Sequence, residues 1–116
     1  MTENDIQRAI VEYLEAVLCP SYRAFAIPNA SRRTKGGKAA NAVPGLRPGV
    51  PDLGIAGEGR IFFLEVKRDQ KASLSDAQHE WANWCLLGRT PWARVESIDH
   101  VRAALHHWGI ETREAA

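Results

Sequence analysis

Two short apolar runs separated by a glycine-rich turn place the strongest constraint on the fold of this chain. The first run covers residues 53–56, the second covers 61–67, and Gly57, Glu58 and Gly59 lie between them. Apolar runs of this length, joined by so few residues, are typical of two strands connected by a tight turn. We therefore expect a β-hairpin in the middle of the chain.

The segments on either side of the hairpin have the periodicities of helices and short strands. Apolar residues recur at helical spacing near the N-terminus until Pro20 ends the helix. Ser75 and Gln78 have the spacing of a capping box, which opens a helix that ends at Gly88, and a final helix ends at Gly109. The expected elements outside the hairpin are a helix over 4–18, a strand over 23–27, a helix over 75–88, a strand over 91–95 and a helix over 97–108. The predicted order is αβββαβα, in the α/β class.

Length and composition favour one ordinary folded domain over residues 1–116. Hydrophobic residues make up 45% of the chain and charged residues 25%, which is the balance of a globular protein. The sequence has no apolar run of 18 residues and begins without a basic segment followed by an apolar one, so we expect a cytoplasmic protein. Cys19 and Cys85 lack a partner spacing and are expected to be free, buried thiols.

The net charge of +1 excludes a protein that binds nucleic acid through overall charge. Any such affinity must be local, and the polar segment over residues 30–51 contains the dense basic cluster of the chain. A segment of that length inside a small domain usually has a function. The basic residues in it are Arg32, Arg33, Lys35, Lys38 and Arg47.

Three charged residues in and beside the hairpin point to chemistry. Glu65 and Lys67 are two apart in a strand and therefore share a face. A salt bridge at the strand end would explain this pair, and a cap at the strand entry would explain Asp52. Hairpin pairing, however, also brings Asp52 close to Glu65. Two adjacent carboxylates repel each other, and a divalent cation that prefers oxygen ligands relieves the repulsion.

The order Pro51-Asp52, twelve intervening residues, then Glu65-Val66-Lys67 resembles the signature of the PD-(D/E)xK nucleases. The wider stretches 48–53, 63–67 and 74–78 look like the virus-type replication-repair nuclease (VRR-NUC) domain. The resemblance implies a restriction-endonuclease-like core, αβββαβ with a C-terminal helix, in which helices flank a mixed central sheet. One VRR-NUC-like nuclease domain would cover residues 1–116.

By the same resemblance, Asp52, Glu65 and the Val66 carbonyl would hold Mg²⁺ or Mn²⁺, while Lys67 would orient water or stabilise the transition state. The implied activity is metal-dependent endonuclease cleavage of DNA in replication, repair or recombination. Branched, flapped or Holliday-junction DNA is the implied substrate, and similar stand-alone domains are often homodimers. The basic cluster would contact phosphates without reading sequence.

Nucleases of this kind usually carry a further acid on the first helix. The candidates are Glu3, Asp5, Glu12 and Glu15. At 100° per residue, Glu3 projects close to the apolar stripe of that helix, Asp5 and Glu12 project away from it, and Glu15 lies on its flank. We therefore choose Glu3 as the further acid, bound to the metal directly or through water. An acid in a first helical turn also favours the helix dipole. Gln78 occupies the glutamine position of the resemblance, and the capping box explains it equally well.

Two other functions remain open from the sequence. The first is a nucleic-acid-binding module that keeps the nuclease scaffold without cutting. The second is a restriction-type, sequence-specific endonuclease, although such enzymes normally carry extra segments that read base edges. The four histidines lack paired ligand spacing and are expected at the surface. The tryptophans, including Trp81 and Trp84, are expected in the core or in a subunit contact, and base stacking is also open for them.

Overall fold

The computed structural model describes residues 1–29 and 43–114. Its elements follow the order that the sequence predicts, and their bounds agree with the predicted ones within about two residues. The elements are α1 (Glu3–Val17), β1 (Tyr22–Ala26), β2 (Leu53–Gly57), β3 (Arg60–Val66), α2 (Asp76–Leu87), β4 (Trp92–Val95) and α3 (Ile98–His107).

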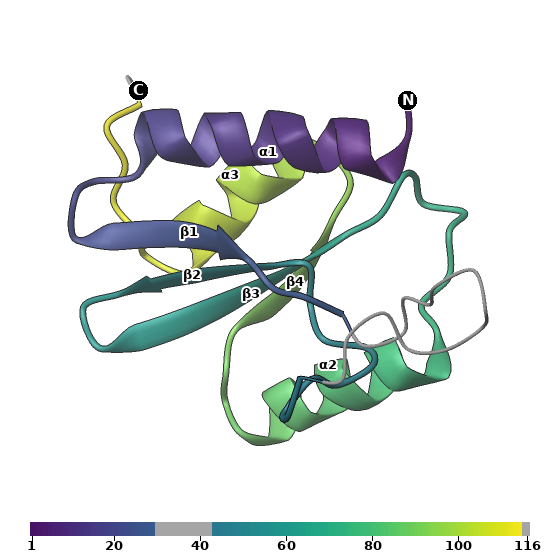
Figure 1. Cartoon of the computed structure of the whole chain (residues 1–116). Coiled ribbons are helices and arrows are strands. Elements are labelled where there is room, and N and C mark those ends of the chain that lie inside the picture. The colour runs from purple at the N-terminus through teal and green to yellow at the C-terminus, as the bar shows by residue number, and fades with distance from the viewer. Residues whose placement is uncertain (30–42, 115–116) are drawn as a thin grey trace.

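The four strands form one mixed sheet in the order β1-β2-β3-β4. β2 pairs antiparallel with β1 and with β3, whereas β3 and β4 run parallel. The turn of the β2–β3 hairpin has positive φ at both Glu58 and Gly59, as the twist of a two-residue hairpin turn requires. α1 and α3 lie on one side of the sheet and α2 lies on the other (Figure 1). This arrangement confirms the predicted α/β class and the mixed central sheet flanked by helices.

Alternation along β3 separates the core from the candidate site. Phe62, Leu64 and Val66 belong to the hydrophobic core together with residues of α1 and α3. Because successive side chains of a strand point to opposite faces, Phe63 and Glu65 lie on the face nearer to α2. The sheet therefore has one face that is buried in the hydrophobic core and a second face that carries Phe63 together with Glu65.

The two outer helices differ in how they bury apolar residues. α1 buries the stripe that its periodicity predicts, which consists of Ile6, Ile10, Leu14 and Val17. In α2 the apolar residues surround the helix, and Cys85 is its one buried residue. Within the described residues, no helix is both long and apolar enough to cross a membrane.

The remaining predictions on side chains have mixed outcomes. All four histidines are exposed, as expected. Both cysteines are free, but Cys19 is only partly buried, so the prediction of two buried thiols is right for Cys85 alone. Trp84 is 58% exposed and therefore does not lie in the core, so a subunit contact or base stacking stays the prediction for this residue. α2 lacks a single apolar stripe, so its periodicity could not show which of its aromatic residues face solvent.

Candidate active site

Asp52 and Glu65 meet where β2 and β3 lie side by side. Leu53 pairs with Leu64, so the next step of the antiparallel register places Asp52 beside Glu65. Two main-chain contacts hold Asp52 there. Its Oδ2 accepts a hydrogen bond of 2.7 Å from the Val66 N–H, and its carbonyl accepts one of 3.0 Å from the Ile27 N–H. The two carboxyl groups are thus brought together by the hairpin, as the sequence predicts.

Glu65 is the most unusual ionisable group of the described chain, because its side chain is only 1% exposed. Burial, together with the neighbouring Asp52, raises the pKa of this carboxyl to about 9, against the opposing effect of Lys67. Oε2 accepts a hydrogen bond of 3.1 Å from Nε2 of Gln78. Oε1 is buried and has no hydrogen-bond partner among the described residues. A buried acceptor of this kind is costly unless a cation or a donor occupies the space beside it.

Lys67 follows β3 directly and is 7% exposed, so its ammonium group is removed from solvent. Its backbone N–H continues the pairing with β4 by donating to the Val95 carbonyl at 2.9 Å. Its Nζ donates to Oε1 of Gln78, also at 2.9 Å. The ammonium group is therefore held at a fixed position on the face that carries Glu65.

Gln78 joins the first turn of α2 to the two charged residues. Its Oε1 accepts from the Ser75 N–H at 2.8 Å as well as from Lys67, and its own N–H donates to the Ser75 hydroxyl at 3.2 Å. Its Nε2 donates to Glu65. The capping box and the contact with the charged residues were alternatives in the sequence. In the structure one side chain makes both sets of contacts.

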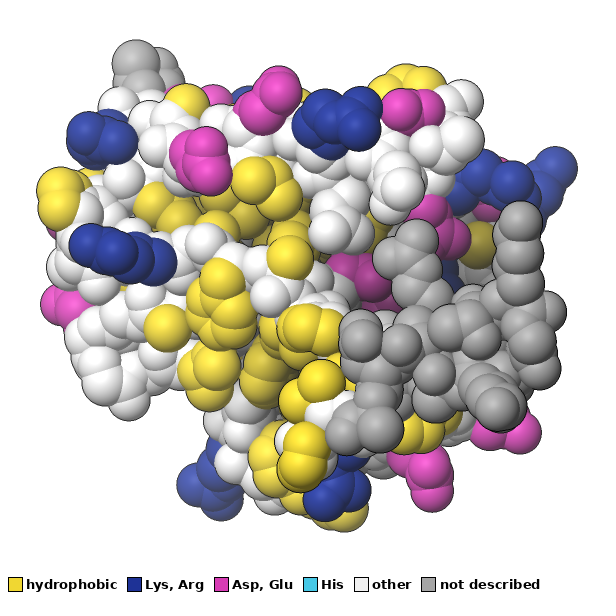
Figure 2. Space-filling model, viewed as in Figure 1, with side chains coloured by type: hydrophobic (Ala, Val, Ile, Leu, Met, Phe, Trp, Pro, Cys, Tyr) yellow, Lys and Arg dark blue, Asp and Glu magenta, His cyan; other side chains and the backbone are white. Residues whose placement is uncertain are grey.

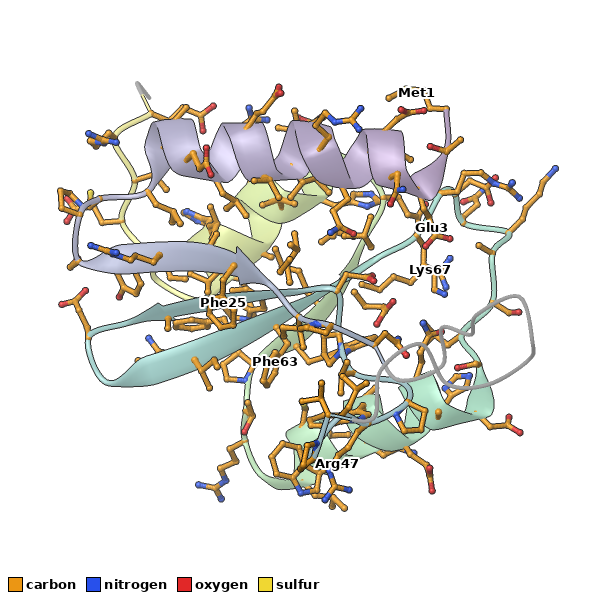
Figure 3. The ribbon with its side chains drawn as sticks, viewed as in Figure 1. Met1, Glu3, Phe25, Arg47, Phe63 and Lys67 are labelled. Atoms are coloured by element: carbon orange, nitrogen blue, oxygen red, sulfur yellow. The ribbon has the colours of Figure 1, made fainter. Side chains whose placement is uncertain are left out.

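Glu3 is the first residue of α1 and is exposed. It lies at the same end of the sheet as Lys67 (Figure 3), and its charge contributes to the raised pKa of Glu65. Asp5, by contrast, accepts from the Thr2 N–H and lies 3.7 Å from Arg8, so the helix cap engages it. Glu12 is exposed as well. Of these acids, Glu3 is the one whose field reaches Glu65.

The donor set fits a small oxygen-preferring cation. Within residues 1–29 and 43–114, no group of three or more His, Cys, Asp or Glu side chains is arranged to hold a metal ion. Mg²⁺ commonly binds through one or two carboxylates and keeps several waters, so the pair of Asp52 and Glu65 falls within its ordinary requirements. The unpartnered Oε1 of Glu65 is the observation that favours a cation.

A cleft of about 430 Å³ opens beside Lys67 and Gln78. One wall is the segment that leads to Asp52. Gly49 lies in it with φ +77°, and a Cβ at this position would come within 2.3 Å of the Ala77 backbone. Sequence reasoning missed Asn29 and Ser73, which also line the cleft. The position of Asn29 just beyond β1, at the end of the sheet where Asp52 precedes β2, was the signal that could have identified it.

Of the predicted DNA-binding residues, the structure describes Arg47. This residue is exposed and lines a second cleft, of about 460 Å³, which shares Pro48 with the first. The other predicted contacts lie outside the described residues, namely Arg32, Arg33, Lys35 and Lys38.

Comparison with known proteins identifies the fold. No family model and no curated protein sequence matches the chain. A solved structure described as "VRR_NUC domain" matches with a TM-score of 0.63 and 20% identity, over 93% of this chain and 99% of that one. A second, described as "VRR_NUC domain protein", matches with a TM-score of 0.57 and 19% identity, over 91% of this chain and 86% of that one. The expected resemblance to the VRR-NUC domain is thus confirmed at the level of the fold.

Proposed function

We propose that this protein is a VRR-NUC-type nuclease that hydrolyses phosphodiester bonds in DNA with the help of Mg²⁺ or Mn²⁺. The observation that carries the proposal is the placement of Asp52 and Glu65 side by side, with the ammonium group of Lys67 on the same face. The fold shared with two VRR_NUC structures supports it. A buried carboxyl group beside a partly buried one and a buried cation is an expensive arrangement, which a purely structural role does not require.

Each residue of the site has a chemical role in this proposal. Asp52, Glu65 and the Val66 carbonyl would hold the ion, and Glu3 would complete the site directly or through water. When bound, the ion lowers the pKa of a water molecule and offsets the charge that develops on the scissile phosphate. Lys67 is a fixed cation that orients the attacking water or stabilises the transition state. Gln78 is a positioning residue, because its contacts hold Glu65 and Lys67 in place.

The proposal extends to the substrate and the assembly. Arg47 and the basic residues Arg32, Arg33, Lys35 and Lys38 would contact phosphates on either side of the cut and so hold DNA without reading its sequence. Branched, flapped or Holliday-junction DNA is the proposed substrate, cut internally during replication, repair or recombination in the cytoplasm. A homodimer would present two sites to one branched molecule.

A panel of labelled DNAs tests the activity. Duplex, single-stranded, flapped and four-way-junction molecules of matched sequence are incubated with Mg²⁺, Mn²⁺ or EDTA, and products are resolved on denaturing gels. We expect cleavage with either ion, none with EDTA, and faster cleavage of the branched molecules. Equal cleavage of all molecules at one base sequence would instead identify a sequence-specific enzyme, and binding without any cleavage would identify a silent module.

Two variants test the assignment of Lys67. Lys67→Ala should abolish cleavage while the circular dichroism spectrum and DNA binding stay nearly unchanged, and Lys71→Ala is the matched control because Lys71 is exposed. Normal cutting by Lys67→Ala would rule out the assigned role.

The assembly and the basic cluster have tests of their own. Neutralising Arg32 and Arg33 should weaken binding equally on different sequences. A sequence-dependent loss would contradict phosphate contact. Sedimentation that shows a monomer alone and on junction DNA would exclude the homodimer.

A further inference from the structure

The second cleft combines aromatic and charged side chains, which suit a ligand that has a flat ring and a charged group. It is lined by Arg47, Pro48, Glu80, Trp81 and Trp84 and has a volume of about 460 Å³. Arg47 lies beside α2 (Figure 3), and a band of apolar side chains runs from the open side of the sheet to this region (Figure 2). Pro48 lines both clefts, so the second cleft lies next to the one beside Lys67.

The aromatic wall of this cleft is held rigidly while one ring remains open to solvent. Trp84 is 58% exposed, and its ring meets that of Trp81 edge to face at a centroid distance of 5.3 Å. Trp81 in turn meets the ring of Phe63 at 6.2 Å. Edge-to-face pairs of this kind fix the orientation of the rings. An exposed indole held in this way offers a surface on which a flat group can stack.

The aromatic wall is also tied to the candidate active site. Phe63 and Glu65 are two residues apart in β3 and lie on the same face, a separation of about 7 Å at the usual rise of a strand. From Phe63 the path continues to the rings of Trp81 and Trp84, at centroid distances of 6.2 Å and 5.3 Å in turn. A DNA strand that runs from the carboxyl pair to the second cleft therefore spans a few nucleotides, at about 3.4 Å per base step.

The chemistry of the cleft distinguishes between ligands. An indole face stacks on any nucleobase, and Arg47 supplies a positive charge for the adjoining phosphate. The carboxylate of Glu80 can accept a hydrogen bond from the amino group of a base. Within a duplex the bases already stack on one another, so the indole gains a partner only when a base is unpaired.

We propose that the second cleft binds an unpaired nucleobase a few nucleotides from the bond that is cut. This inference rests on the proposed nuclease function and narrows its substrate to DNA with a single-stranded segment beside the cleavage point. Trp84 supplies the stacking surface, Trp81 fixes its orientation, and Arg47 holds the phosphate. The site would thereby select flaps and open junctions over continuous duplex.

Binding in EDTA tests the cleft without any cleavage. The probes are a labelled duplex, the same duplex with a short flap, and a flapped duplex whose flap bases next to the junction are replaced by abasic residues. Trp84→Ala should weaken binding of the flapped DNA by about 5- to 150-fold, the range for loss of one stacked base. Trp84→Phe should retain most of the affinity, and neither variant should alter binding of the continuous duplex.

A matched control separates stacking from a general apolar contact. Leu87 is on the same helix and is 85% exposed, but it does not line the cleft. Leu87→Ala should therefore bind like the wild type. Equal losses for Leu87→Ala and Trp84→Ala, or conversion of a dimer to a monomer by Trp84→Ala in sedimentation, would overturn the proposal in favour of a protein contact.

The abasic probe provides the decisive comparison. The wild type should bind the abasic probe more weakly than the intact flap, by the same factor by which Trp84→Ala weakens binding of the intact flap. Trp84→Ala should bind the abasic probe and the intact flap with equal affinity. If the substitution and the abasic replacement each weaken binding and their effects on the binding free energy add, the proposed stacking contact is overturned. Because these measurements exclude metal, an absence of cleavage with Mg²⁺ would overturn the nuclease proposal separately, even if base-dependent binding of the flap persists.

Discussion

Replacing Glu65 by glutamine should stabilise the metal-free protein, and the gain should grow with pH. Burial and Asp52 raise the pKa of this carboxyl from 4.5 to about 9. Between these values the folded protein retains a proton that the unfolded chain has released, so the free energy of unfolding falls as pH rises. The slope is about 1.4 kcal/mol per pH unit for one proton. Glutamine resembles the protonated acid and removes this dependence.

The measurement is urea unfolding of the wild type and Glu65→Gln in EDTA at pH 5.5 and pH 7.5. Over these two pH units the wild type should lose roughly 3 kcal/mol relative to the variant. All other ionisable groups are the same in both proteins, so the difference between their free energies of unfolding reports on Glu65. Asp52→Asn is a second variant for comparison. Loss of this neighbour lowers the pKa of Glu65, so the free energy of unfolding should stop falling at a lower pH than in the wild type.

Binding of a metal ion should raise the free energy of unfolding that the ionisation of Glu65 lowers. At pH 7.5 an ion bound to the ionised carboxyl pair should raise the free energy of unfolding of the wild type by about 2.7 kcal/mol at a hundredfold excess over Kd. The variant, which lacks one ligand, should gain much less. A difference between wild type and Glu65→Gln that stays constant from pH 5.5 to 7.5 would refute the reasoning, because Glu65 would then titrate like an exposed acid.

Three further predictions concern the neighbours of the carboxyl pair and its affinity for metal. Gln78→Ala should lower the free energy of unfolding by about 1–2 kcal/mol and reduce cleavage at least tenfold, whereas Ser75→Ala, which removes the cap alone, should cost about 1 kcal/mol and retain cleavage in the same gel assay. Gly49→Ala should destabilise more than Gly45→Ala in urea unfolding, because both have positive φ but only the Cβ at 49 collides with α2. Mg²⁺ affinity, measured by calorimetry, should rise about tenfold per unit from pH 6 to 8 as Glu65 releases its proton, and a pH-independent affinity would contradict this.

The part of the site that the sequence predicts is the part that strand geometry determines. The turn at residues 57–59 sets the hairpin register, and a register places Asp52 beside Glu65 without knowledge of any other contact. The period of two then puts Glu65 and Lys67 on one face. The stripe of α1 was equally clear, because its apolar residues recur at helical spacing. These features depend on local pattern alone.

The contacts of α2 could not be predicted in the same way. Its apolar residues surround the helix, so periodicity does not reveal that Trp84 is exposed or that Cys85 is buried. The positions of Asn29 and Ser73 in the cleft depend on how separate segments pack, as does the fit of Gly49 against Ala77. Packing between distant segments leaves no periodic signal in the chain.

The double role of Gln78 links the folding of α2 to the assembly of the site. The acceptor oxygen that caps the first turn of the helix also binds the Lys67 ammonium group, and the amide nitrogen of the same side chain binds Glu65. Fraying of that turn would release both charged residues from their positions at once, leaving a buried acid and a buried cation without partners. The helix terminus is therefore expected to be more stable than its exposed location suggests. Hydrogen exchange can measure this stability, and an N–H of Gln78 that exchanges as fast as that of an ordinary first turn would show that the contacts with the charged residues do not restrain the helix.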